Sequence, residues 1–96
     1  MGRLMGRKAV FFDRDGVLNR DVGYLHRVED LEWIPGAKEL VAALCEKSFL
    51  LFVVTNQSGV ARGYFSEEDV ERLHRFMNEE LAKSGGQITE FFYCPH

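Results

Sequence analysis

Phe-Leu-Leu-Phe-Val-Val-Thr, residues 49–55, is the stretch of sequence that decides the fold class. It is short, apolar at both odd and even positions, and rich in β-branched and aromatic side chains, which is typical of a buried strand in a parallel sheet. Lys8–Asp13 and Ile88–Cys94 are two further runs of this kind, the first ending abruptly in charged residues and the second partly alternating. The sequence therefore predicts three strands.

Helical patterns separate these three runs. The first helix is expected to begin at Pro35-Gly36, because apolar residues then recur at helical spacing: Ala37, Leu40, Val41, Leu44 and Cys45. The second is expected to begin after the N-cap Ser66 and to end at Gly85-Gly86, with a stripe of Val70, Leu73, Phe76, Met77 and Leu81. Strands that alternate with helices predict an open α/β sheet covered on both faces, and residues 20–34 are expected to form a loop or small hairpin over its edge.

Length and composition limit what the chain can be. Its 96 residues fit one domain, and 46% apolar against 28% charged residues is a composition that folds. The net charge of −3 excludes a strongly basic nucleic-acid binder and gives no reason to expect a membrane surface as partner. No apolar run approaches the roughly 20 residues of a membrane span. Because Cys45 and Cys94 cannot make a disulfide framework, we expect a cytoplasmic protein.

Two carboxylates stand where the first predicted strand ends, in Asp13-Arg14-Asp15-Gly16. In an open parallel sheet, ligands bind outside the carboxyl ends of the strands. There Asp13 could act as a nucleophile, and Asp15 could protonate a leaving oxygen and then deprotonate water. Together they offer the oxygen ligands that Mg²⁺ prefers. The alternative is an ordinary turn that ends a strand, because Asp and Gly are common turn residues.

Polar residues also follow the second predicted strand, in Thr55-Asn56-Gln57-Ser58-Gly59. A hydroxyl, amides and a glycine at a strand end could cradle phosphate oxygens, and Arg62 a few residues later could clamp a phosphate. The alternatives are a plain polar loop and a solvated surface arginine. The occurrence of such groups at two neighbouring strand ends favours a phosphate site.

These motifs resemble those of a known superfamily. Phe11–Asn19 (FFDRDGVLN) resembles the first motif of the haloacid dehalogenase (HAD) superfamily, and Val53–Gly63 (VVTNQSGVARG) resembles the second motif of its histidinol-phosphatase-like branch. Within that branch the chain is most similar to the D-glycero-D-manno-heptose 1,7-bisphosphate phosphatase family, including Asp21–Tyr24 (DVGY) and Tyr93–His96 (YCPH). The resemblance covers nearly all of the chain from Ala9 onward and implies a three-layer, Rossmann-like parallel sheet.

The resemblance implies a role for each matching residue. Asp13 would form an aspartyl-phosphate and ligate Mg²⁺, while Asp15 would be the general acid and base and would give its backbone carbonyl to the metal. Thr55 would hold the transferring phosphoryl group. In addition to Arg62, substrate contacts are expected from Asp21, Val22, Gly23, Tyr24, Thr55, Asn56, Gln57 and Ser58.

Zinc and the edge of the sheet follow from the same resemblance. Cys94 and His96 resemble the first two ligands of a Cys-x-His…Cys-x-Cys zinc loop, although two ligands do not complete a tetrahedral site. From its residue type and position alone, Cys94 is expected to be a buried strand residue. In HAD sheets a fourth strand lies beside the first, so without it Ala9–Asp13 is expected to be an exposed edge that promotes self-association.

The expected extent of the chain is the N-terminal portion of one HAD-like hydrolase domain, over residues 1–96, as far as the third strand of the sheet. The family's third motif, a lysine, its fourth, an acidic motif, and the last two zinc ligands would lie beyond residue 96.

The expected function is Mg²⁺-dependent removal of phosphate from a sugar bisphosphate through an aspartyl-phosphate. Two alternatives are a histidinol-phosphate phosphatase, which shares these motifs, and a catalytically incompetent fragment that only binds Mg²⁺ and phosphate. DNA 3′-phosphatases have a similar second motif, but the net charge of −3 disfavours a polyanionic partner. The expected partner is thus a phosphorylated small molecule, with neither a nucleic acid nor a membrane.

Overall fold

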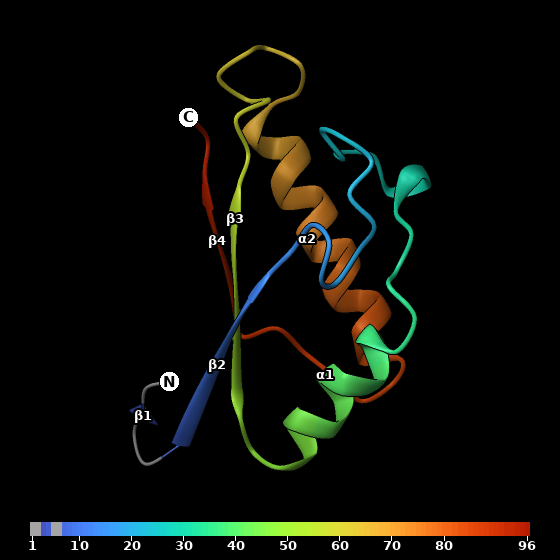
Figure 1. The fold of residues 1–96 in the computed structure, drawn as a ribbon, viewed down its shortest axis with the longest axis vertical. Helices are drawn as coiled ribbons and strands as arrows, with labels where there is room; N and C mark the ends of the chain where they lie inside the picture. The colour runs from blue at the N-terminus through green and yellow to red at the C-terminus, as the bar shows by residue number, and fades with distance from the viewer. Residues whose placement is uncertain (1–2, 5–6) are drawn as a thin grey trace.

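The computed structural model describes residues 3–4 and 7–96. Its elements run in the order strand, strand, 3₁₀ turn, helix, strand, helix, strand (Figure 1): β1 (Arg3–Leu4), β2 (Arg7–Asp13), η1 (Val28–Asp30), α1 (Ala37–Glu46), β3 (Leu50–Asn56), α2 (Glu67–Ala82) and β4 (Glu90–Cys94). All three predicted strands and both predicted helices are therefore present, and the strand ends differ from the prediction by one or two residues.

The strands form one sheet in the order β1-β2-β3-β4. β2 is parallel to β3, with Phe11 opposite Phe52, and β3 is parallel to β4. These pairings confirm the expected parallel sheet. The short β1 was not predicted: it pairs antiparallel with the start of β2, at Arg7 and Lys8, and so short a strand leaves no periodic pattern in the sequence.

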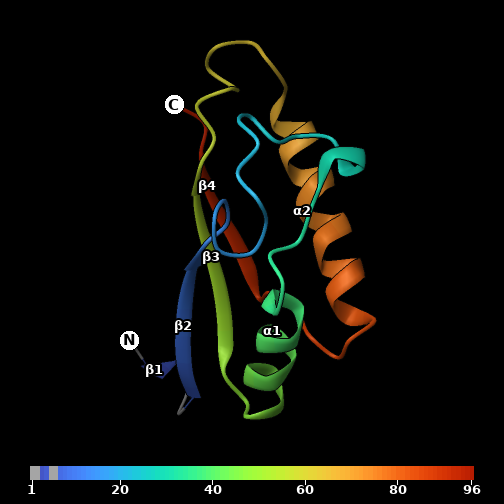
Figure 2. The ribbon, with the colours of Figure 1, turned by 45° about the vertical axis from the view of Figure 1, so that its right-hand side comes forward.

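Both helices lie on the same face of the sheet (Figure 2). On that face Leu51 and Val53 of β3 are fully buried, with 0% of each residue exposed. They share a core with Val41 of α1 and with Leu73 and Met77 of α2. This core uses the apolar stripes that the helical spacing predicts.

The opposite face of the sheet is apolar as well, but none of the described helices covers it. Phe11, Val54 and Phe92 are 57%, 47% and 45% exposed. Phe52 lies between two of these rings, with its centroid 5.1 Å from that of Phe11 and 5.9 Å from that of Phe92. Of the three layers expected, the described residues thus form the sheet and one helical layer.

The helix starts follow from local chemistry. In a capping box, the Asp69 backbone N–H donates to Ser66 Oγ (3.1 Å) and the Ser66 N–H donates to Asp69 Oδ2 (3.0 Å), as the N-cap prediction requires. In α1, Ala37 and Val41 are buried but Leu40 is 47% exposed, so the prediction that Leu40 faces the core is wrong. Leu40 lies on the outer margin of the stripe.

Among the described residues, neither helix has the length and apolar character needed to cross a membrane.

Residues 20–34 form a loop that is tied at its base, as the expected small hairpin would be. Asn19 and Trp33 form an antiparallel bridge, and the Arg20 N–H donates to the Glu32 carbonyl at 2.8 Å. Leu25, which is 3% exposed, anchors the loop in the core. The loop lies on the same side of the sheet as α2 (Figures 1 and 2), and along the chain it connects β2 to α1.

Candidate active site

The carboxyl ends of β2 and β3 meet at one pocket. Asp13 is the last residue of β2 and pairs with Val54 of β3, which places Asp15 and Thr55 on adjacent chain segments. A pocket of about 200 Å³ is lined by Asp13, Arg14, Asp15, Val54, Thr55 and Asn56. The structure therefore brings together the predicted nucleophile, the predicted acid and base, and the predicted phosphate-holding threonine. Asp13 is exposed at the strand end, where a ligand could reach its carboxylate.

Asp15 is held in place by donors from both sides. Asn19 Nδ2 donates to Asp15 Oδ1 at 3.0 Å, and Arg14 Nε donates to the same oxygen at 2.8 Å. Asn19 itself is fixed, because its backbone carbonyl accepts from the Gly16 N–H at 2.7 Å. The positive φ of Gly16, 88°, makes this tight turn possible. The turn after β2 is thus built to orient one carboxylate.

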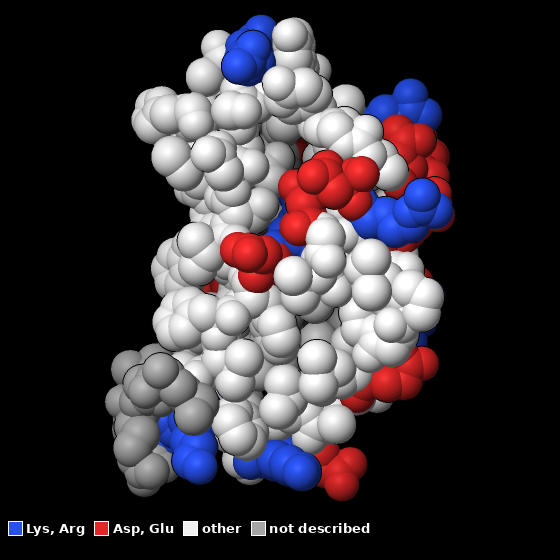
Figure 3. All heavy atoms as spheres, in the orientation of Figure 1, with Lys and Arg blue, Asp and Glu red and all other residues white. Residues whose placement is uncertain are grey.

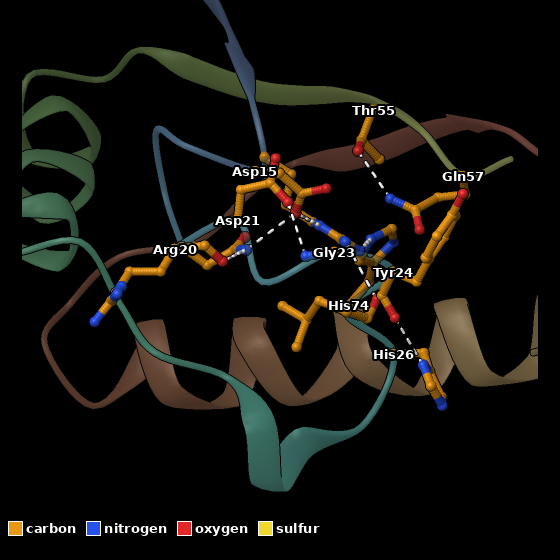
Figure 4. A network of polar contacts seen from close by, with 12 residues as sticks. Asp15, Arg20, Asp21, Gly23, Tyr24, His26, Thr55, Gln57 and His74 are labelled. Carbon is orange, nitrogen blue, oxygen red and sulfur yellow. Dashed lines mark hydrogen bonds and ion pairs between the residues drawn. The ribbon is translucent and has the colours of Figure 1, made fainter. Parts of the chain in front are cut away.

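Arg14 and His74 are the site residues that the sequence analysis missed. Arg14 is 1% exposed and His74 is 5% exposed, and Arg14 Nη1 lies 3.2 Å from His74 Nε2 (Figure 4). His74 belongs to α2, whose apolar stripe runs through Val70 and Met77. Its position four residues after Val70 was the available signal, because a histidine on a buried stripe needs a partner.

Burial dominates the electrostatics of His74. Burial and the nearby Arg14 guanidinium lower the pKa of His74 to about 3, with Asp15 acting in the opposite direction. The imidazole is therefore neutral at pH 7. Its ring also stacks on Phe91 of β4, with the centroids 4.1 Å apart and the planes at 12°. A neutral, stacked ring provides Arg14 with a fixed hydrogen-bond acceptor.

At the end of β3, Thr55 is oriented by Gln57. Thr55 is 9% exposed, and Gln57 Nε2 donates to its Oγ1 at 2.9 Å (Figure 4). The Gln57 backbone N–H donates in turn to the Cys94 carbonyl at 2.7 Å, which ties the loop to β4. Because Thr55 Oγ1 accepts from Gln57, its own O–H remains free to donate to a phosphoryl oxygen in the pocket.

The predicted substrate segment Asp21–Tyr24 and Arg62 are not among the residues that line this pocket. Val22, Gly23 and Tyr24 line a separate hollow of about 390 Å³ in the loop beside α2. Within that loop the Gly23 N–H donates to Asp21 Oδ1 at 3.1 Å (Figure 4). Arg62 is exposed and is not among the residues that line the pocket at Asp13. The described structure therefore does not join these segments to the carboxylates.

The oxygen donors of the pocket fit a hard cation better than the end of β4 fits zinc. Asp13 and Asp15 supply carboxylate and carbonyl oxygens of the kind that Mg²⁺ prefers. Cys94 is exposed, so the expectation that it is buried is wrong, because its side chain leaves an outer strand toward solvent. In the part of the chain that the structure describes, no group of three or more His, Cys, Asp or Glu residues is placed to hold a metal ion.

Comparisons with known proteins support the resemblance that the sequence motifs indicate. The chain is 47% identical over 93 residues to the D-glycero-beta-D-manno-heptose-1,7-bisphosphate 7-phosphatase of Haemophilus ducreyi, covering 96% of this chain and 51% of that protein. It is 45% identical over 92 residues to the D-glycero-alpha-D-manno-heptose-1,7-bisphosphate 7-phosphatase of Campylobacter jejuni, covering 96% of this chain and 54% of that protein. The chain thus spans about half the length of the curated relatives it matches. No protein-family model matches it.

A solved structure agrees with these relatives. The D,D-heptose 1,7-bisphosphate phosphatase from B. bronchiseptica, complexed with magnesium and phosphate, superposes with a TM-score of 0.88 at 34% identity. The match covers 93% of this chain and 50% of that one. The resemblance predicted from the two strand-end motifs is confirmed: over nearly all of its length this chain is similar to heptose-1,7-bisphosphate 7-phosphatases, and its fold is the HAD-like fold of their solved structures.

Proposed function

We propose that this chain supplies the catalytic carboxylates of a Mg²⁺-dependent phosphomonoesterase that acts on a sugar bisphosphate, in the manner of a heptose 1,7-bisphosphate 7-phosphatase. The observation that carries the proposal is the gathering of Asp13, Asp15 and Thr55 around one pocket at two adjacent strand ends. The names of the relatives support the choice of a sugar bisphosphate. Residues 1–96 then form part of a single HAD-like hydrolase domain.

The reaction proceeds in two displacements at phosphorus. An Asp13 carboxylate oxygen attacks the phosphorus in line, the bond from phosphorus to the sugar oxygen breaks, and Asp15 gives its proton to that leaving oxygen. Asp15 then takes a proton from water, and the water oxygen attacks the phosphorus of the aspartyl-phosphate. The bond from phosphorus to the Asp13 oxygen breaks, inorganic phosphate leaves, and Asp13 is again a carboxylate while Asp15 is again protonated.

Polar groups around the carboxylates position the substrate. The free O–H of Thr55 donates to an oxygen of the transferring phosphoryl group, and Asn56 lines the same pocket. The exposed segment Asp21–Tyr24 and the exposed Arg62 contact the rest of the substrate, together with the half-buried Ser58. Gln57, which is buried, acts through Thr55.

Two metals enter the proposal differently. The Asp13 carboxylate and the Asp15 backbone carbonyl are the residues that would hold Mg²⁺, which when bound offsets the negative charge of the phosphoryl group. Cys94 and His96 would be half of a zinc site and would need further ligands to complete it. The proposed mechanism uses no step at zinc.

The test is phosphate release by the protein that carries this chain, with D-glycero-D-manno-heptose 1,7-bisphosphate and Mg²⁺. Asp13→Asn should reduce turnover to background, because an amide cannot form the aspartyl-phosphate. Asp15→Asn should slow it by about 10²–10⁴-fold, the usual contribution of a general acid and base. Glu79→Gln, the same carboxylate-to-amide change at an exposed position of α2 away from the pocket, is the matched control.

Other outcomes separate the alternatives. Residual turnover of Asp13→Asn within tenfold of the parent would show that Asp13 is not the nucleophile. Faster release of phosphate from histidinol phosphate than from the heptose bisphosphate would support a histidinol-phosphate phosphatase. Binding of Mg²⁺ and phosphate without turnover would identify an incompetent fragment.

Self-association belongs to the same proposal. Of the residues in β2, β1 pairs only with Arg7 and Lys8, so the described structure leaves the outer edge of Ala9–Asp13 without a partner strand. That edge adjoins the uncovered apolar face. We propose that a second copy of the chain binds at this edge and face.

A cytoplasmic location also remains a prediction.

A further inference from the structure

The residue between the two aspartates has an unusual environment. Arg14 lines the catalytic pocket, yet it is 1% exposed. Burying a guanidinium is costly unless it is paired and hydrogen-bonded. Three acceptors surround it: Asp15 Oδ1 at 2.8 Å, His74 Nε2 at 3.2 Å and the Leu25 carbonyl at 3.4 Å. They come from the turn after β2, from α2 and from the loop, so three separate parts of the chain fix one side chain.

The contact with His74 determines the state of its ring. An arginine can only donate hydrogen bonds, so His74 Nε2 must accept from Arg14 Nη1. The proton of the ring is therefore on Nδ1, and the ring is neutral. A protonated imidazole would place a second positive charge 3.2 Å from the guanidinium. The ring also stacks on Phe91 of β4, which limits its rotation.

The two carboxylate oxygens of Asp15 have different hydrogen-bond partners. Oδ1 accepts from both Arg14 and Asn19, whereas no described residue donates to Oδ2. The side chain of Asp15 is 26% exposed, so part of the carboxylate reaches the pocket. An acid or base with one oxygen tied down can present the other in a fixed direction.

The geometry points to Arg14 and His74 as positioning residues: they hold Oδ1 of Asp15 so that Oδ2 faces the reacting oxygen. This inference rests on the proposed function of Asp15. His74 acts through Arg14 and does not touch the substrate. The contact couples α2 to the catalytic turn across 60 residues of sequence.

Two substitutions at His74 form a matched pair. Gln has a side-chain oxygen that can take the place of Nε2 as acceptor, whereas Leu is similar in size and cannot accept. His74→Leu should release Arg14 from its orientation, and His74→Gln should retain it. Thermal unfolding of both variants shows whether each is folded before any other property is compared.

The first measurement is NMR of the 15N-labelled 96-residue chain, which requires no turnover. The ring nitrogens of His74 should show the proton on Nδ1 at pH 7. The Arg14 Nε–H should exchange slowly with solvent in the parent and in His74→Gln, and at least about tenfold faster in His74→Leu, because a hydrogen-bonded donor is protected. If His74→Leu does not fold, the positioning role is tested by the tautomer of His74 in the parent and by the exchange rate of the Arg14 Nε–H in His74→Gln.

The second measurement is steady-state turnover, in the protein used for the phosphatase assay. His74→Leu should lower kcat by about 10–100-fold with KM changed less than about threefold, since a misplaced group affects the chemical step more than binding. His74→Gln should recover kcat to within about threefold of the parent.

Contrary results are equally specific. A proton on Nε2 of His74, Arg14 exchange that is unchanged in His74→Leu, or a folded His74→Leu with normal kcat would overturn the positioning role. If the parent shows no turnover that depends on Asp13, the proposed function fails instead, and the NMR measurements alone decide whether His74 and Arg14 fix Asp15.

Discussion

The two faces of the sheet have similar composition but different surroundings. On the helix-covered face, Leu51 and Val53 are 0% exposed, whereas Val54, the next residue along β3, is 47% exposed on the opposite face. Phe11 and Phe92 extend that open face on the neighbouring strands. The difference shows that an apolar strand pattern reports which side chains can be buried, while the placement of the helices decides which of them are.

The distribution of charge follows the same division. In the space-filling view, charged side chains are sparse on the left, where the strands lie, and gather on the right, over the loop and helices (Figure 3). An apolar surface with few charges favours association with another apolar surface. The open face and the helix-covered face should therefore respond differently to the same kind of substitution.

The largest expected effect is on the helix-covered face. Leu51→Ala should lower the free energy of unfolding by about 2–5 kcal/mol, because it removes buried methyl groups and leaves a cavity against α1 and α2. The net stability of a domain this small is of similar size, so the variant should be largely unfolded at 25 °C. Urea titration followed by circular dichroism is the measurement.

The matched control for Leu51→Ala is Phe92→Ala on the open face. It removes a larger side chain, but one that is 45% exposed, so it should cost clearly less stability. Equal losses in the two variants would show that the open face is covered in solution, and the contrast between the faces would then be wrong.

A second effect, of intermediate size, comes from His74 on the buried side of α2. Its folded pKa of about 3 lies below its ordinary 6.5, so between these values the unfolded chain binds a proton that the folded chain does not. Stability from this group is thus present above pH 6.5 and is lost as the pH falls toward 3. Between pH 7 and pH 4 the loss should be on the order of 3 kcal/mol.

The comparison that isolates this term is the parent against His74→Gln, titrated with urea at pH 7 and pH 4. Carboxylates contribute to acid destabilisation in both proteins and cancel in the difference. Arg14 and Asp15 face the ring in the parent, and their charges act on it in opposite directions. If both proteins lose the same stability, His74 is not held neutral by burial.

The sequence predicted those parts of the molecule that depend on local pattern. Asp13, Asp15 and Thr55 could be placed at one site because each lies at or just after the end of a recognisable strand, and parallel strands bring their carboxyl ends to one edge. Ser66 could be identified as a cap because the capping box lies within three residues. The chemistry in both cases is near in sequence to the element that positions it.

The parts that could not be predicted depend on contacts between distant residues. The contact of Arg14 with His74 joins positions 60 residues apart, and no spacing rule connects a turn after a strand with a later helix. Leu40 fits the apolar stripe of α1, but its burial depends on how far the helix is rotated against the sheet. The uncovered face could not be foreseen, since strand composition is apolar on both sides.

The smallest expected effect on stability is on the open face, and it carries the proposal of self-association. Phe11→Thr keeps a residue suited to a strand but removes the ring of a residue that is 57% exposed. The free energy of unfolding should therefore change by less than about 1 kcal/mol. Association should nevertheless weaken, because the ring stacks on Phe52 at the centre of the apolar patch.

The variant Val10→Lys is less informative than Phe11→Thr, since Val10 packs against the core and a lysine there could unfold the domain. Sedimentation across a concentration series measures the change. Unaltered association in a folded Phe11→Thr would exclude this face as the interface, and a parent that stays monomeric at high micromolar concentration would exclude self-association itself.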